Sequence, residues 1–239
     1  MQVERRSFLL GGSAALSVTL AGCAGFSRSM PPTSDMLGGF FGPSAIGNET
    51  ISTPDYTAIY GAYRGEQFPI EAFDYTKVDP QFLRQEVVYP GTEPAGTIVV
   101  DPRSRHLYFI EPGHRATRYG VGVGREGFAW SGRAQINLKR NWPDWIPPAE
   151  MVARLPEIKS QLVRTARGMG VPGGPRSPLG ARAMYLFGDG RDLGYRVHGT
   201  LEPETIGTEV SSGCIRLVNQ DVVHLYARTA LGTKVLVLG

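Results

Sequence analysis

A histidine and a cysteine are the residues of this chain whose types and spacing are best suited to chemistry. His198 ends an apolar stretch, and Cys214 follows sixteen positions later, directly after Ser211, Ser212 and Gly213. A thiol reacts as the thiolate, and a neighbouring imidazole is the usual base that forms it. The small residues before Cys214 allow a sharp turn in which amide N–H groups converge beside the sulfur, as an oxyanion hole requires.

Arg216 adds a positive charge to this pattern. It lies two positions after Cys214, so on an extended segment both side chains point to one face. A cation there favours the thiolate and can bind a substrate carboxylate. A lone cysteine is more often a small buried residue, however, and a lone histidine at a strand end is more often structural. From the residues alone, catalysis and structure are evenly matched.

Longer stretches of the sequence resemble a known family. His198-Gly199-Thr200 and then residues 211–217 (SSGCIRL) resemble the signature of L,D-transpeptidases with a YkuD-type catalytic domain. The resemblance extends from about Gly96 to Gly239, and four more stretches resemble the family in the same order: IVVDPRSRHLYFI, YGVGVGREG, LKRNWPDWIPPAEM and PLGARAMYLF. It implies a mainly β, β-sandwich-like fold with a helical insertion and a C-terminal helix, and it implies neither a cofactor nor a metal ion.

The resemblance also implies a reaction. The substrate is the peptide stem of bacterial peptidoglycan, in which Cys214 attacks the carbonyl of the third residue. The D-amino acid in fourth position leaves, and a thioester remains. His198 is the general base, oriented by the carbonyl of Gly199, and main-chain N–H groups around Ser212, Gly213 and Cys214 stabilise the oxyanion.

Several points stay open within this resemblance. Arg216 matches an arginine of the family that would hold the turn or a carboxylate, whereas Ser212 stands where many members have a second histidine. The general base remains, so activity is expected. The acceptor is an amine of another stem (a 3–3 cross-link), an amine of an outer-membrane protein, or water, which would make the protein an L,D-carboxypeptidase. If Cys214 is unreactive, a non-catalytic cell-wall-binding lipoprotein is the alternative.

The N-terminus has the features of an export signal. Residues 5–9 (RRSFL) match the twin-arginine pattern, and a short, mildly apolar stretch follows. Residues 20–23 (LAGC) resemble a lipobox, in which Cys23 receives a lipid anchor; the alternative is ordinary cleavage that removes Cys23. In either case Cys214 would be the only thiol in the oxidising periplasm, and catalysis explains an exported thiol without a disulfide partner.

Composition sets the fold class and the partners. The 239 residues include 31 Gly and 18 Pro, which favours a loop-rich, mostly β architecture. A net charge of +3 without a basic run argues against nucleic acid as a partner. We divide the chain into a signal segment (1–23), a Gly/Pro/Ser/Thr-rich flexible linker (24–58), an aromatic-rich extension packing on the catalytic domain (59–95) and the catalytic domain (96–239).

Apolar periodicity predicts the elements of the catalytic domain. Strands are expected over residues 97–100, 105–111, 115–123, 182–187, 194–197 and 234–238. Helical spacing extends over 149–167, with Pro156 opening a second helix inside that range. The aromatic, proline-rich segment 141–148 fits a packed loop and a substrate wall equally well. Asn219 is predicted to cap a helix over 220–231.

Overall fold

The computed structural model describes residues 50–124, 130–208 and 213–239. Within these ranges the chain is mainly β, as the sequence predicts, and ten of the strands belong to one mixed sheet. Several predicted features lie outside the described residues: the signal segment with Cys23, most of the linker, Ser211 and Ser212. No helix in the described ranges is both long and apolar enough to cross a membrane.

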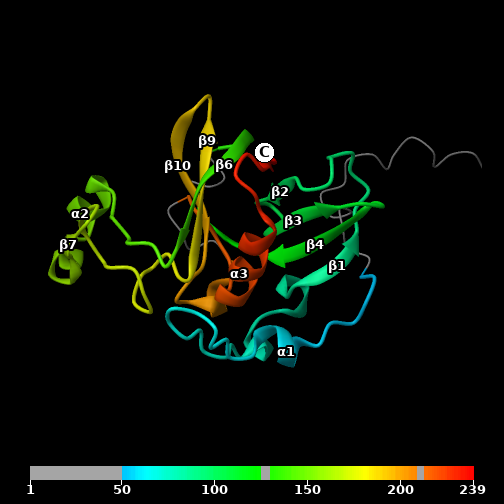
Figure 1. Cartoon of the computed structure of the whole chain (residues 1–239), viewed down its shortest axis with the longest axis horizontal. Helices are drawn as coiled ribbons and strands as arrows, with labels where there is room; N and C mark the ends of the chain where they lie inside the picture. Colours follow the sequence, from blue (N-terminus) through cyan, green and yellow to red (C-terminus); the bar gives the residue numbers. More distant parts are fainter. Residues whose placement is uncertain (1–49, 125–129, 209–212) are drawn as a thin grey trace, which may run out of the picture. The chain divides into compact units, whose positions relative to one another are not determined.

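The large sheet has the order β1-β4-β3-β2-β12-β6-β9-β10-β11-β5. The predicted meander forms β2, β3 and β4, and β12 joins it by pairing in parallel with β2 and antiparallel with β6. Figure 1 shows the meander to one side of α3 and the tall β9–β10 hairpin to the other. The strands run as follows: β1 Gln85–Val88, β2 Ile98–Asp101, β3 His106–Glu111, β4 Arg115–Gly120, β5 Gly122–Val123, β6 Gly132–Asn141, β9 Arg182–Gly188, β10 Arg191–His198, β11 Ile215–Arg216 and β12 Lys234–Val237.

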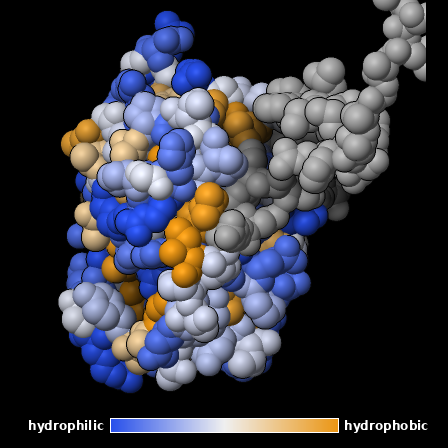
Figure 2. All heavy atoms as spheres, turned by 90° about the vertical axis from the view of Figure 1, so that its right-hand side faces the viewer, coloured by the Kyte–Doolittle hydropathy of each residue, from blue (hydrophilic) through white to orange (hydrophobic). Residues whose placement is uncertain are grey.

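The sheet curves back on itself around the main core. β5 follows β4 after one residue, Val121, yet it pairs with β11 at the other end of the strand order. Val197, Ile215 and Leu217 enter the core from the strands near the candidate site, and Val222 enters it from α3. On the face shown in Figure 2, outside its grey atoms, hydrophobic residues form only narrow patches between hydrophilic ones.

Residues before β2 pack along α3 and β9. The helix α1 spans Tyr56–Tyr60, and short 3₁₀ helices span Tyr75–Lys77 and Pro80–Phe82. The Tyr60 hydroxyl donates to Asp221 Oδ2 at 3.1 Å. Glu66 Oε1 accepts from Arg182 Nη2 at 2.5 Å in an ion pair whose two side chains are largely buried. Because β1 also pairs with β4, this stretch belongs to the same sheet as the candidate site.

The insertion between β6 and β9 is only partly helical. It contains α2 (Ala149–Arg154), a 3₁₀ helix over Pro156–Gln161 that opens at Pro156 as predicted, and the hairpin β7 (Val163–Thr165) and β8 (Gly168–Gly170). The prediction of helix up to residue 167 is therefore wrong beyond Gln161. β-Branched residues favour the hairpin there, as does Gly168, which has φ +130° where the chain leaves the turn to begin β8. Figure 1 shows α2 and β7 in an arm that projects away from β9 and β10.

Other elements also differ from the predictions. The C-terminal helix α3 spans Asn219–Arg228, with Val218 as its N-cap and no side-chain capping bond, so the predicted capping role of Asn219 is wrong. Its side chain makes tertiary hydrogen bonds instead. β10 begins at Arg191 rather than Gly194, and β6 was not predicted.

Candidate active site

His198 and Cys214 lie on neighbouring strands. β10 and β11 are parallel, with Val197 opposite Ile215 and His198 opposite Arg216. Val197 and Ile215 face the core, so the residues on either side of them point to the outer face of the sheet. Cys214 is therefore level with Arg196, and His198 is the diagonal neighbour of Cys214. By standard strand spacing, the Cα atoms of His198 and Cys214 are about 8 Å apart.

Hydrogen bonding fixes the tautomer of His198. Its Nδ1 lies 2.6 Å from the carbonyl oxygen of Gly199. A carbonyl only accepts, so Nδ1 carries the proton and the neutral ring keeps its lone pair on Nε2. His198 is 5% exposed, and burial lowers its pKa to about 4. The Gly199 and Leu179 carbonyls oppose this decrease, and the charges of Arg216 and Arg196 add to it. The imidazole is thus neutral at pH 7 and able to accept a proton.

Asn219 holds the chain segment that orients His198. Its Oδ1 accepts from the Ala181 N–H at 2.9 Å, and its Nδ2 donates to the Thr200 carbonyl at 3.0 Å. A side chain at Gly199 would collide with Asn219 Oδ1, so glycine is required there. Gly199 N also donates to the Arg182 carbonyl at 3.1 Å. The sequence pattern does not reveal this role of Asn219, because an asparagine before a helix is also typical of a cap.

Cys214 follows a turn and is half-buried. Gly213 has φ +103°, a left-handed conformation that favours glycine, so the predicted sharp turn is present at this residue. Burial raises the pKa of the Cys214 thiol. The Arg196 backbone N–H and the positive charges of Arg196 and Arg216 act in the opposite direction, while Asp192 adds to the increase. At neutral pH the thiol and the imidazole are therefore both uncharged.

Arg216 carries buried donors next to Gly122 of β5. Its side chain is 10% exposed, and Nη1 donates to Glu202 Oε2 at 3.3 Å. Among the described residues, its Nε and Nη2 are buried without a hydrogen-bond partner. Buried donors of this kind are costly unless an acceptor reaches them. The arrangement is suited to an anionic or carbonyl group that enters from outside.

Sequence comparison identifies the family. Residues 95–237, which include β2 to β12 and both candidate residues, match the model of the L,D-transpeptidase catalytic domain. The chain belongs to this family. YbiS of Escherichia coli K12, described as a probable L,D-transpeptidase, is 30% identical over 157 residues, which cover 64% of this chain and 47% of YbiS. The probable L,D-transpeptidase ErfK/SrfK of Salmonella typhimurium is 32% identical over 159 residues, which cover 64% of this chain and 47% of ErfK/SrfK. The chain thus spans about half the length of these relatives.

Solved structures are similar to this L,D-transpeptidase domain as well. A Brucella melitensis structure, described as a probable carnitine operon oxidoreductase, is 47% identical and covers 69% of this chain and 99% of its own, with a TM-score of 0.45. L,D-transpeptidase 3 of Mycobacterium tuberculosis is 16% identical. The match covers 66% of this chain and 69% of that structure's chain, with a TM-score of 0.43. Both TM-scores are below 0.5, so membership of the family rests on the sequence match.

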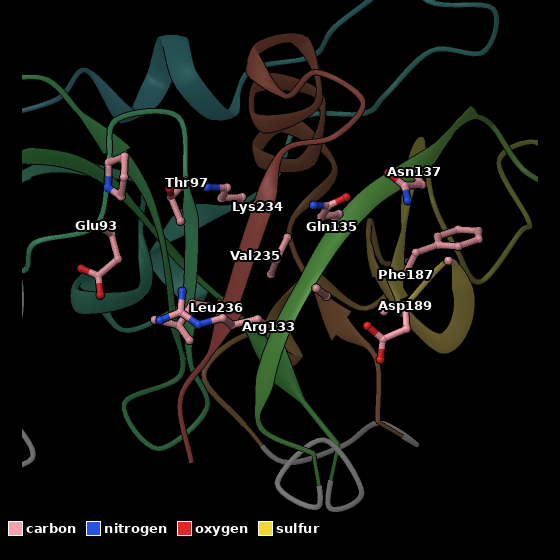
Figure 3. A pocket seen from close by; sticks show the side chains of 14 residues that line it. Glu93, Thr97, Arg133, Gln135, Asn137, Phe187, Asp189, Lys234, Val235 and Leu236 are labelled. Atoms are coloured by element: carbon pink, nitrogen blue, oxygen red, sulfur yellow. The ribbon is translucent and has the colours of Figure 1, made fainter.

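Two cavities of the L,D-transpeptidase domain lie outside the pair of strands that carries His198 and Cys214. A cavity of about 600 Å³ is bounded by β6, β12 and the end of β9, and Figure 3 shows Arg133, Gln135 and Phe187 among its lining side chains. None of the candidate residues lines it. A second cavity, of about 480 Å³, borders Thr200 just after the candidate histidine and includes Trp142.

The aromatic segment before the insertion is packed at Trp142. This side chain is 7% exposed, donates from Nε1 to Glu66 Oε2 at 3.2 Å, and lies edge-on to Phe68 with 5.4 Å between ring centres. The prediction of a packed loop for segment 141–148 therefore holds for Trp142. The Trp142 side chain also borders the second cavity.

Proposed function

We propose that the protein is an exported cysteine L,D-transpeptidase that acts on the tetrapeptide stems of peptidoglycan. The observation that carries this proposal is the fixed tautomer of His198, diagonal to Cys214 on the same face of a family-typical sheet. Residues 59–95 and 96–239 would act together, because the earlier stretch contributes β1 to the same sheet.

The first half-reaction forms a thioester. The Cys214 sulfur attacks the carbonyl carbon of the third stem residue while its proton passes to Nε2 of His198. Since both groups rest uncharged, proton transfer accompanies attack rather than preceding it. The tetrahedral intermediate collapses, the C–N bond to the terminal D-amino acid breaks, and His198 returns the proton to the leaving amine. The Gly199 carbonyl stabilises the imidazolium that exists between these steps.

The second half-reaction releases the acyl group. An acceptor amine attacks the thioester carbon and His198 takes its proton. The C–S bond then breaks, and His198 returns the proton to the sulfur to regenerate the thiol. We infer that main-chain N–H groups at Gly213 and Cys214, with Ser211 and Ser212, bind the oxyanion. Arg216 would supply the buried donors Nε and Nη2 to a carboxylate of the stem.

We also infer where the protein acts. The twin-arginine pattern in residues 5–9 would direct it to the periplasm, and a lipid on Cys23 would anchor it to a membrane. The acceptor would be an amine of a second stem or of an outer-membrane protein.

Product analysis tests the proposal. The full chain and Cys214→Ala are incubated with purified tetrapeptide stems, and the products are separated by chromatography and identified by mass. The expected result is a released D-amino acid and stem dimers with wild type only.

The other outcomes assign the alternatives. Tripeptide without dimers indicates water as the acceptor, hence an L,D-carboxypeptidase, unless an added protein amine captures the acyl group. Equal product from Cys214→Ala, or no product from wild type, contradicts the transpeptidase proposal and favours a wall-binding lipoprotein.

A further inference from the structure

Arg196 is the side chain level with Cys214 on the neighbouring strand. It stands one residue before the Val197–Ile215 pair, as Cys214 does on its own strand, so both side chains leave the same face of the sheet. Parallel strands lie about 4.8 Å apart, which places the base of the Arg196 side chain beside the sulfur.

Several contacts hold the guanidinium on this face. Nη1 and Nη2 each donate to one carboxylate oxygen of Asp192 at 2.9 Å, a bidentate pair. Nη1 also donates to the Tyr195 carbonyl at 3.1 Å. The guanidinium carbon lies 4.4 Å from the ring centre of Tyr185. A side chain with this many contacts has few rotamers available, so its charge occupies a defined place.

An irregularity in β10 makes these contacts possible. On a regular strand, residues four apart are separated by about 13 Å, too far for the Asp192 and Arg196 side chains to meet easily. The register with β9 shifts between them, and Gly194 has φ +82° and donates its N–H to Asp192 Oδ1 at 2.9 Å. Such bulges often re-aim side chains next to active sites.

The insertion arm holds Tyr185, the residue whose ring supports Arg196. Arg167, in the β7–β8 turn, donates from Nη1 to the Tyr185 hydroxyl at 3.1 Å. Tyr185 is therefore held from the arm while its ring supports Arg196. The sequence prediction of a helical insertion did not include this contact, which depends on the hairpin.

We propose that Arg196, whose backbone is level with Cys214 on the neighbouring strand, is a positioning residue whose positive charge promotes formation of the Cys214 thiolate. This inference rests on the proposed role of Cys214 as nucleophile. The charged and titratable groups around the sulfur are Arg196 and Asp192 from β10, Arg216 from β11 and the neutral His198. Asp192 partly cancels the charge of Arg196 and also fixes the guanidinium in place.

The test measures how alkylation of Cys214 depends on pH. Iodoacetamide reacts with the thiolate, so the pH at half-maximal rate reports the thiol pKa. The full chain is used, and peptide mapping separates Cys214 from Cys23. Arg196→Gln should raise the midpoint by about one pH unit or more, as expected for loss of a close opposite charge. Arg196→Lys should retain much of the wild-type value.

Controls separate this role from a structural one. Arg191→Gln removes the same charge from the exposed start of β10 and should leave the midpoint unchanged. If Arg196→Gln does not fold, Arg196→Met keeps an apolar stem against Tyr185 and should show the same increase. A folded variant without Arg196 that keeps the wild-type midpoint overturns the inference.

The two proposals fail in distinguishable ways. An acyl-enzyme on wild type together with an unchanged midpoint in Arg196→Gln leaves the transpeptidase proposal intact and contradicts the role of Arg196. A shifted midpoint without any acyl-enzyme supports the role of Arg196 in thiol ionisation and contradicts the transpeptidase proposal.

Discussion

His198 and Cys214 are held in different ways, although they lie on neighbouring strands. His198 ends an eight-residue strand, and its carbonyl accepts from Leu217 N at 2.9 Å. The following Gly199 donates to the Arg182 carbonyl, and Asn219 holds Thr200. Cys214 precedes a strand of only two residues and follows a glycine turn.

The difference separates two tasks. Main-chain hydrogen bonds fix the orientation and tautomer of the base, whereas side-chain charges from Arg196 and Arg216 act on the nucleophile. Changes around His198 should therefore affect geometry and stability together. Changes around Cys214 should affect ionisation and substrate binding with less effect on folding.

The largest expected effect is that of His198→Ala. Acylation by a carbapenem should slow by about 10²–10⁴-fold, because the proton on sulfur has no acceptor. Stopped-flow or mass-resolved acylation rates measure this. His114→Asn is the matched control, since His114 is an exposed turn residue at φ +55° and asparagine tolerates that conformation. Wild-type acylation of His198→Ala would show that another group is the base.

Asn219→Ala tests the main-chain support of the base. It removes two hydrogen bonds and leaves the Ala181 N–H and the Thr200 carbonyl without them. The free energy of unfolding should fall by about 1–3 kcal/mol, and acylation should slow as well. Urea unfolding and acylation rates are compared with Asn137→Ala, which alters an exposed residue of β6 and should change stability by less than about 0.5 kcal/mol. Unchanged acylation in a destabilised Asn219→Ala would limit this residue to a structural role.

A smaller effect is expected for Arg216→Lys. The charge beside Cys214 is kept, but the forked guanidinium is lost, so KM for the stem should rise about tenfold while kcat changes less. Arg103→Lys, in an exposed turn, is the control. A fall in kcat with no change in KM would place Arg216 at the oxyanion or the thiolate instead of a stem carboxylate.

The last expected effect concerns how stability depends on pH. Burial lowers the pKa values of His106, His198 and His224 to about 4, below their ordinary value near 6.5. Between these values the unfolded chain binds more protons, so stability is lost as pH falls from about 6.5 to 4. Burial raises the pKa of Asp221 to about 6, which acts in the opposite direction over about pH 4–6. The urea midpoint should therefore fall from pH 7 to pH 4.5, and more steeply in Asp221→Asn; a constant midpoint in both would contradict these shifts.

Local sequence patterns predicted much of the sheet and the family, because alternation of apolar residues depends only on which face is buried. The same signal was available for β6, where Ala134, Ile136 and Leu138 alternate with polar residues. The β7–β8 hairpin was missed because Leu162 and Val163 also continue a helical spacing.

Other features depend on contacts between distant residues. Asn219 has the type and position of a helix cap, and only the approach of Ala181 and Thr200 gives its side chain different partners. The Asp192–Arg196 pair depends on a register shift against β9, which no local pattern specifies. His198 and Cys214 themselves could be predicted from the sequence, since the glycine and arginine next to the thiol are local signals.

The most direct test of the account is the intact mass of the full chain after exposure to a carbapenem or a tetrapeptide stem, with peptide mapping of the modified residue. The account predicts one covalent adduct on the Cys214 peptide of wild type, none on Cys214→Ala, and very slow formation on His198→Ala. An adduct that persists in Cys214→Ala, or wild type that stays unmodified while folded, would contradict it.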